Sequence, residues 1–231
     1  MLQPRKDRTE QLKNDIFRTS LKLFSTKGYD HTTIKDIIEA AGISNGSFFH
    51  HFGRKSGLLD MYMVSMNEQY EKFKRETLDT EPLSSSDACT RLCHFLEYCF
   101  YILTAGGIEL TRAYYTSLMN EESDDFGILS HDRCLATTII ELMNEGREAG
   151  IFRADVTPEA AFDEIEYYVD GIIFDICTGR YHLLGRRDEE PRVTTQSTGQ
   201  DLVKVREAAG NLVKEFVILQ YVVPEKQDSY R

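Results

Sequence analysis

The chain has 231 residues, of which 41% are hydrophobic and 28% charged, as is typical of a globular protein with a buried core. No apolar run approaches the ~18 residues that a membrane-spanning helix needs. The first twenty residues are charged, which argues against a secretory signal. The five cysteines are an odd number, so reduced thiols are expected rather than a disulfide framework. These features predict a cytoplasmic protein with no membrane partner.

The net charge of −11 is distributed unevenly along the chain. Residues 1–60 hold 10 Lys+Arg against 7 Asp+Glu, a net of +3, whereas residues 61–231 hold 17 against 31, a net of −14. A basic first part on an acidic body favours nucleic-acid contact through the N-terminal part alone. Chance fluctuation of surface charge gives the same count, so the interpretation depends on the motif found there.

The chain begins with a polar stretch and a helix. Residues 1–9 are expected to be frayed, and their basic side chains Arg5, Lys6 and Arg8 suit either a solvated tail or contacts to phosphates. Apolar residues then recur at helical spacing over residues 10–27, and Gly28 ends this predicted helix.

Residues 32–59 predict two short helices joined by a tight turn, followed by a longer helix. Thr33 can cap the first helix together with Asp36, three residues further on. Gly42 supplies the left-handed conformation that ends this helix, and Ser44 can cap the second, over residues 45–51. Small and polar residues at the start of the second helix allow close approach to a phosphate backbone or a groove floor. This is the outline of a helix-turn-helix, whose second helix lies in the DNA major groove.

The residues around this turn resemble the N-terminal domain of the tetracycline-repressor (TetR) family. The pattern consists of Ile16, Phe24, Gly28-Tyr29, Thr33-Ile34, Ile37, Ala41-Gly42-Ile43-Ser44, Gly46-Ser47, Phe49, His51-Phe52, Lys55 and Leu58. The resemblance implies a repressor that binds a palindromic double-stranded DNA operator as a homodimer and responds to a small molecule. Two departures are visible: the family commonly has Lys where this chain has Asn45, and usually Tyr where it has Phe49. The Tyr hydroxyl tends to donate to a DNA phosphate.

The expected DNA contacts divide into two kinds. Asn45 and Ser47, with Lys35 as a third candidate, are expected to contact base edges. The remaining candidates are expected to position the protein on phosphates or to lie beside them: Thr33, Phe49, His50, His51 and Lys55.

The rest of the chain predicts helices only, with no internal repeat and no convincing strand. The expected helices cover residues 54–78, 87–105, 108–120, 129–149, 157–178 and 201–223, with a break at 80–86, glycines at 106–107, an acidic turn at 121–125 and a long loop at 180–200. The predicted fold is therefore all-α: a helix-turn-helix domain over 1–54 and a helical regulatory and dimerisation domain over 55–231. The resemblance implies that the last two helices form the dimer interface, and both are apolar over more than one stripe.

Other chemistry receives less support. Cys89, Cys93 and Cys99 on one apolar helix are expected to be core residues, since no second pair of metal ligands appears at a recognisable spacing. A zinc or thiol redox site is the alternative. His50 and His51 are neighbours on a helix and point about 100° apart, so they are not expected to hold one ion. No phosphate loop or nucleophile motif is present, so no enzyme activity and no cofactor are predicted.

An effector pocket in the body is expected to be lipophilic or aromatic, because aromatic residues are dense there. The candidate lining residues are Tyr98, Tyr101, Glu109, Tyr114, Tyr115 and Tyr167, with Glu109 able to favour a cation. Packing in an ordinary core is the competing interpretation for each of them. Two other functions stay open: an activator or architectural DNA binder without a ligand, and a helical ligand-binding or catalytic module.

Overall fold

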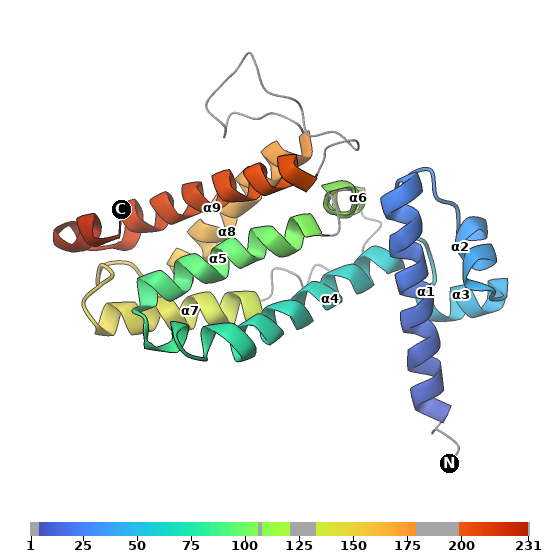
Figure 1. The fold of residues 1–231 in the computed structure, drawn as a ribbon, viewed down its shortest axis with the longest axis horizontal. Helices are drawn as coiled ribbons and strands as arrows, with labels where there is room; N and C mark the ends of the chain where they lie inside the picture. Colours follow the sequence, from blue (N-terminus) through green and yellow to red (C-terminus); the bar gives the residue numbers. More distant parts are fainter. Residues whose placement is uncertain (1–4, 106–107, 121–132, 179–198, 231) are drawn as a thin grey trace. The chain divides into compact units, whose positions relative to one another are not determined.

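The computed structural model describes residues 5–105, 108–120, 133–178 and 199–230. Its α-helices are α1 (Arg5–Lys27), α2 (Ile34–Ala41), α3 (Asn45–Phe52), α4 (Gly57–Phe73), α5 (Ala88–Ala105), α6 (Ile108–Met119), α7 (Cys134–Glu148), α8 (Pro158–Thr178) and α9 (Gly199–Tyr221), as Figure 1 shows. The described residues also contain a π-helical turn at Lys74–Leu78 and 3-10 helices at Leu83–Ser85 and Pro224–Ser229. The prediction of an all-α fold is confirmed.

The helices form two compact units, and α4 contributes to both, up to Ser65 in the first and from Met66 in the second. The first unit contains α1, α2, α3, the start of α4, and α6. Its core is made by side chains with little or no exposure: Ile16, Phe24, Ile37, Phe48, Leu58 and Leu59. α1 packs against both α2 and α6. The boundary predicted between residues 54 and 55 stays a prediction.

The second unit is a helical bundle in which α5 packs against α9 and α7, α7 against α8, and α8 against α9 (Figure 1). Its core includes Leu92, Phe95, Met143, Phe162 and Val213. Arg91 on α5 donates to both carboxylate oxygens of Glu145 on α7, at 2.9 and 2.8 Å. The chain end is tied to the loop after α7, because Val223 N–H donates to Ile151 O and Arg153 N–H to Tyr221 O.

Several helix boundaries differ from the sequence-based expectation. α1 begins at Arg5 rather than residue 10, because Arg, Lys, Gln and Glu are good helix formers and no breaker follows before Gly28. α4 begins at Gly57 rather than residue 54, with Ser56 at the cap position, where its carbonyl accepts the Asp60 N–H. The 3-10 helix at Pro224–Ser229 was not predicted, although Pro224 at its first position is a start signal.

The helix predicted over residues 54–78 also changes type. From Lys74 its hydrogen bonds widen to a π-helical turn, in which Asp79 N–H donates to Lys74 O, and Leu78 is fully buried. The Lys74 ammonium lies 3.1 Å from Asp79 and 3.3 Å from Glu141 on α7, which fixes this turn against the bundle.

Some expectations fall on parts of the chain outside the described residues. These are the break at residues 106–107, the acidic turn at 121–125, the start of the helix predicted at 129, and most of the loop at 180–200. Within the described residues, none of the helices combines the length and apolarity needed to cross a membrane.

Candidate nucleic-acid interface

The start of α2 is fixed by a reciprocal capping box, as the sequence predicts. Thr33 Oγ1 accepts the Asp36 N–H at 3.1 Å, and the Asp36 carboxylate accepts the Thr33 N–H at 2.7 Å. Lys27 Nζ at the end of α1 donates to the same carboxylate at 2.7 Å. The Lys27 hydrogen bond, followed by those from Thr33, holds the pKa of Asp36 well below its usual range. The end of α1 is thereby joined to the start of α2.

The turn between α2 and α3 has three residues, Gly42, Ile43 and Ser44. Gly42 adopts φ +64°, the left-handed region that side chains rarely enter. Ile43 N–H donates to Ile38 O at 3.2 Å, and Ser44 Oγ accepts the Ser47 N–H at 3.2 Å. The predicted caps of both helices are therefore confirmed.

α3 presents one buried face and one exposed face. Phe48 is fully buried and Phe52 is 8% exposed, so these two rings anchor the helix in the first unit. Asn45 and His50 are exposed, and Phe49 is 48% exposed although it is a large apolar side chain. The N-terminal half of α3 therefore offers an amide and small residues to a partner, while its aromatic side fixes the orientation.

The two histidines of α3 differ in surroundings. Their ring centroids are 5.1 Å apart, and His51 also lies 6.3 Å from the ring of Phe52. Burial, and secondly the charge of His50, lower the pKa of His51. A neutral His51 can donate one hydrogen bond to a phosphate but adds little charge at neutral pH.

The two candidate lysines are held differently. The Lys35 side chain is 84% exposed, 3.8 Å from Glu39 on the same helix. Lys55 Nζ donates to the carbonyls of Tyr29 and Thr32, at 3.0 and 3.2 Å, and lies 4.1 Å from the centroid of the Tyr29 ring. Lys55 therefore fixes the connection between α1 and α2, a role that sequence spacing did not indicate.

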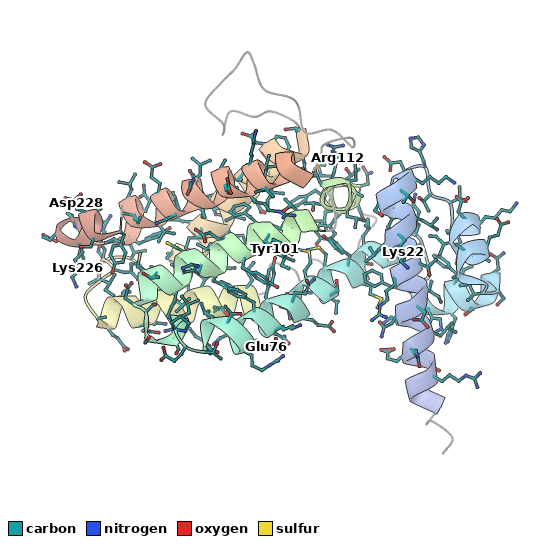
Figure 2. All side chains as sticks on the ribbon, in the orientation of Figure 1. Lys22, Glu76, Tyr101, Arg112, Lys226 and Asp228 are labelled. Carbon is teal, nitrogen blue, oxygen red and sulfur yellow. The ribbon has the colours of Figure 1, made fainter. Side chains whose placement is uncertain are left out.

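The six candidate effector-contacting residues are divided between the two units. Tyr98 and Tyr101 on α5 stack at 5.9 Å, with Phe73 stacked on Tyr98 at 4.0 Å (Figure 2 labels Tyr101). Tyr167 on α8 is 75% exposed.

The other three candidates are on α6. Tyr114 is 2% exposed and lies edge-on to Tyr115 at 5.8 Å. Glu109 pairs with Arg112 at 2.7 Å. The role of all six in binding an effector stays a prediction. Sequence reasoning missed Arg112, although its spacing of three from Glu109 on a helix is a recognisable signal for a pair.

The cysteines occupy the core, as predicted. Cys89, Cys93 and Cys99 are 0%, 6% and 2% exposed. Burial raises the pKa of the Cys99 thiol, which therefore stays protonated at neutral pH. Within the described ranges no group of three or more His, Cys, Asp or Glu side chains is placed to hold a metal ion.

The chain matches known regulators in sequence. Residues 16–61 match the family described as bacterial regulatory proteins, tetR family. The uncharacterised helix-turn-helix transcriptional regulator YerO of Bacillus subtilis is 38% identical over 73 residues, 30% of this chain and 25% of YerO. The probable transcriptional regulator ArpR of Pseudomonas putida is 24% identical over 190 residues, 80% of this chain and 86% of ArpR. The chain thus spans only a quarter of YerO but most of ArpR.

A solved structure agrees with the fold of the whole chain. A TetR-family transcriptional regulator of Pectobacterium atrosepticum is similar with a TM-score of 0.64 and 16% identity, covering 96% of this chain and all of that protein. The capped helix-turn-helix lies inside the segment that the family description matches, and the fold similarity extends through the helical body. Residues 16–61 therefore carry the N-terminal domain of the tetR family of bacterial regulatory proteins, and the chain shares the fold of a TetR-family regulator.

Proposed function

We propose that this protein is a transcriptional repressor that binds a palindromic operator as a homodimer and releases it when a small effector binds in the helical body. The observation that carries the proposal is the exposed start of α3 at Asn45 and Gly46. The Ser44 cap and the buried ring of Phe48 hold this helix in place. The location proposed is the cytoplasm, where operator DNA is found.

The proposed contacts follow the exposed face of this motif. Asn45 and Ser47 contact bases, with Lys35 as a third reader, because amides and hydroxyls can hydrogen-bond base edges in the major groove. Thr33, His50, His51 and Lys55 contact phosphates, and Phe49 lies beside them. Thr33 and Lys55 have structural hydrogen bonds of their own, so each would serve DNA contact and local stability together.

Gel shifts with the DNA upstream of the protein's own gene test the DNA-binding part of the proposal. Lys35→Gln should weaken binding and reduce its dependence on salt, because each lysine that neutralises a phosphate or lies beside one releases counterions. Lys72→Gln is the matched control, since it removes the same charge from an exposed lysine on α4 that also pairs with a glutamate four residues on. No shift with upstream or genomic fragments, or equal losses in both variants, would contradict the proposal.

The proposed dimer uses α8 and α9. Tyr167 and Phe174 are 75% and 52% exposed, seven residues apart on one face of α8, and Leu219 on α9 is 46% exposed. Exposed apolar residues that share one helix face, as Tyr167 and Phe174 do, suit an interaction surface. Val213 and Val217 on α9 are fully buried, so removing this helix would destroy the bundle core rather than test the dimer.

Point substitutions test the dimer without this loss. Phe174→Glu combined with Leu219→Glu should convert a dimer to monomers in sedimentation experiments. Val64→Glu is the matched control, because Val64 is 48% exposed but lies on α4. A monomeric wild-type chain would contradict both the dimer and the palindromic operator.

The proposed effector is lipophilic or aromatic. The stacked rings of Phe73, Tyr98 and Tyr101 support this, because a planar ligand can pack against the half-exposed Tyr101, whose ring centroid lies 4.8 Å from the Arg206 guanidinium. Such a ligand releases DNA only if it prefers the conformation that binds the operator poorly. Titration with planar aromatic compounds should release operator DNA from the wild type, and Tyr101→Ala should weaken that release.

A further inference from the structure

A cavity of about 550 Å³ lies within the first unit, apart from the aromatic stack of Phe73, Tyr98 and Tyr101, although one of the six effector candidates, Glu109, lines it. Its walls are the turn after α1 at Tyr29 and Asp30, residues 54–56 before α4, and one side of α6 from Glu109 to Asn120. Its volume is within the range of small-molecule sites, ~300–1,000 Å³. Asp30 and Arg54 are 24 positions apart and Ser56 and Glu109 are 53 positions apart, so no local pattern indicates this cavity.

Two cations line the cavity where α4 begins. Arg54 and Lys55 immediately precede Gly57, the first residue of the 17-residue helix α4. The positive end of the α4 dipole adds to their charge, although the first N–H groups of α4 already donate to carbonyls three residues earlier. Asp60 pairs with Arg54 at 3.8 Å and offsets part of its charge. The positive charge of this wall therefore comes mainly from Lys55 and the α4 dipole.

The opposite wall is nearly neutral. Arg112 and Glu109 on α6 form an ion pair at 2.7 Å, so their charges offset each other (Figure 2 labels Arg112). Asp30 is exposed at the edge of the cavity. The lining has three cations and two carboxylates, and two of the cations, Arg54 and Lys55, adjoin the N-terminus of α4.

A buried hydroxyl completes the lining. Ser117 is 2% exposed, and among the described residues its Oγ has no hydrogen-bond partner. A buried polar group left without a partner costs free energy, and most such groups in proteins are paired. Because Ser117 lines the cavity, a ligand there can supply the missing partner.

We propose that this cavity binds a small anion carrying a carboxylate or phosphate group. Arg54, Lys55 and Arg112 would attract the charge, and the Ser117 hydroxyl would donate to an oxygen of the ligand. The lining polar groups set this site apart from the aromatic stack on α5. All lining residues belong to the first unit. Anion binding can therefore be measured without DNA and does not depend on the proposed repressor function.

Calorimetric titration of the full chain with citrate and with inorganic phosphate, at fixed ionic strength and without DNA, tests the site. At least one probe should give saturable binding of one anion per chain. Arg112→Gln leaves Glu109 uncompensated and should weaken binding about tenfold or more, whereas Ser117→Ala should weaken it about 2- to 10-fold. Arg18→Gln, which removes an exposed charge on α1 outside the cavity, is the matched control and should change binding less than ~2-fold.

Ala113→Phe, which fills the cavity, keeps the test informative if Arg112→Gln fails to fold. Saturable binding of citrate alone assigns a carboxylate ligand, and binding of phosphate alone assigns a phosphate ester. The proposal is overturned if neither probe saturates, if Arg112→Gln and Arg18→Gln have equal effects, or if folded Ala113→Phe protein binds as tightly as the wild type.

Discussion

Phe49→Tyr adds one hydroxyl group to α3, and this change tests whether a DNA phosphate lies beside the ring. The Phe49 ring is 48% exposed and lies edge-on to Phe48 at 5.6 Å, so Phe49→Tyr adds a hydroxyl toward solvent without crowding the core. A hydrogen bond contributes a net ~0.5–1.5 kcal/mol. A dimer makes the contact twice, so we expect tighter binding by ~1–3 kcal/mol, roughly 5- to 150-fold. Because phosphates carry no sequence information, operator and scrambled duplexes should gain equally.

Asn45→Ala is the matched change four residues earlier on the same helix. Asn45 is exposed at the first position of α3, directly after the Ser44 cap, so its loss leaves the capping hydrogen bond in place. A good bidentate base contact is worth ~1–3 kcal/mol of discrimination. Operator binding should weaken by that amount per half-site, while binding to scrambled duplex stays nearly unchanged. Equal weakening on both duplexes would refute base readout by Asn45, and no gain with Phe49→Tyr would refute a phosphate beside that ring.

Three further outcomes follow from the described contacts. Gly146→Ala should lower the free energy of unfolding in urea: a Cβ there would meet the ring of Phe152, which is 2% exposed, and overpacking of ~1–3 kcal/mol outweighs the gain in helix propensity of about 1 kcal/mol. The lowered pKa of Asp36 stabilises the fold above the unfolded value of about 3.9 and ceases to do so as pH falls through the folded value; the stability difference between wild type and Asp36→Asn should therefore be constant near neutrality and narrow in acid. Cys99, whose pKa is raised by burial, should resist iodoacetamide in the native chain and react in urea, and rapid native labelling would contradict its core position.

The helix-turn-helix was predictable because its determinants are local. Thr33 and Asp36 are three residues apart, and Gly42 and Ser44 lie in the short turn that joins α2 to α3. The sequence alone therefore indicates each cap. Each capping residue and its hydrogen-bond partner lie only a few positions apart along the chain. The same holds for Thr157, whose Oγ1 accepts the Ala160 N–H at the start of α8, next to Pro158.

Non-local features were not predictable in this way. The ion pair between Arg91 and Glu145 joins residues 54 positions apart, and nothing in either local pattern selects the partner. The sequence at Lys74–Leu78 continues the helical pattern of α4, so it does not indicate a π-helical turn. The Lys74 ammonium pairs with Glu141 on α7, a partner that the local sequence does not reveal. The exposure of the aromatic residues was not predictable either. Tyr114 and Tyr167 are the same residue type, yet Tyr114 is buried and Tyr167 is 75% exposed.

Lys55 shows how one side chain joins the two proposed sites. Its ammonium holds the carbonyls of Tyr29 and Thr32, and Thr32 directly precedes the capping residue of α2. The same side chain lines the cavity beside Arg54. An anion in that cavity would attract the ammonium that fixes the start of the helix-turn-helix, because the ammonium would then share its hydrogen bonds between the anion and the two carbonyls. Coupling between the cavity and the DNA-contacting helices would then act within the first unit, through one residue, without a signal from the helical body.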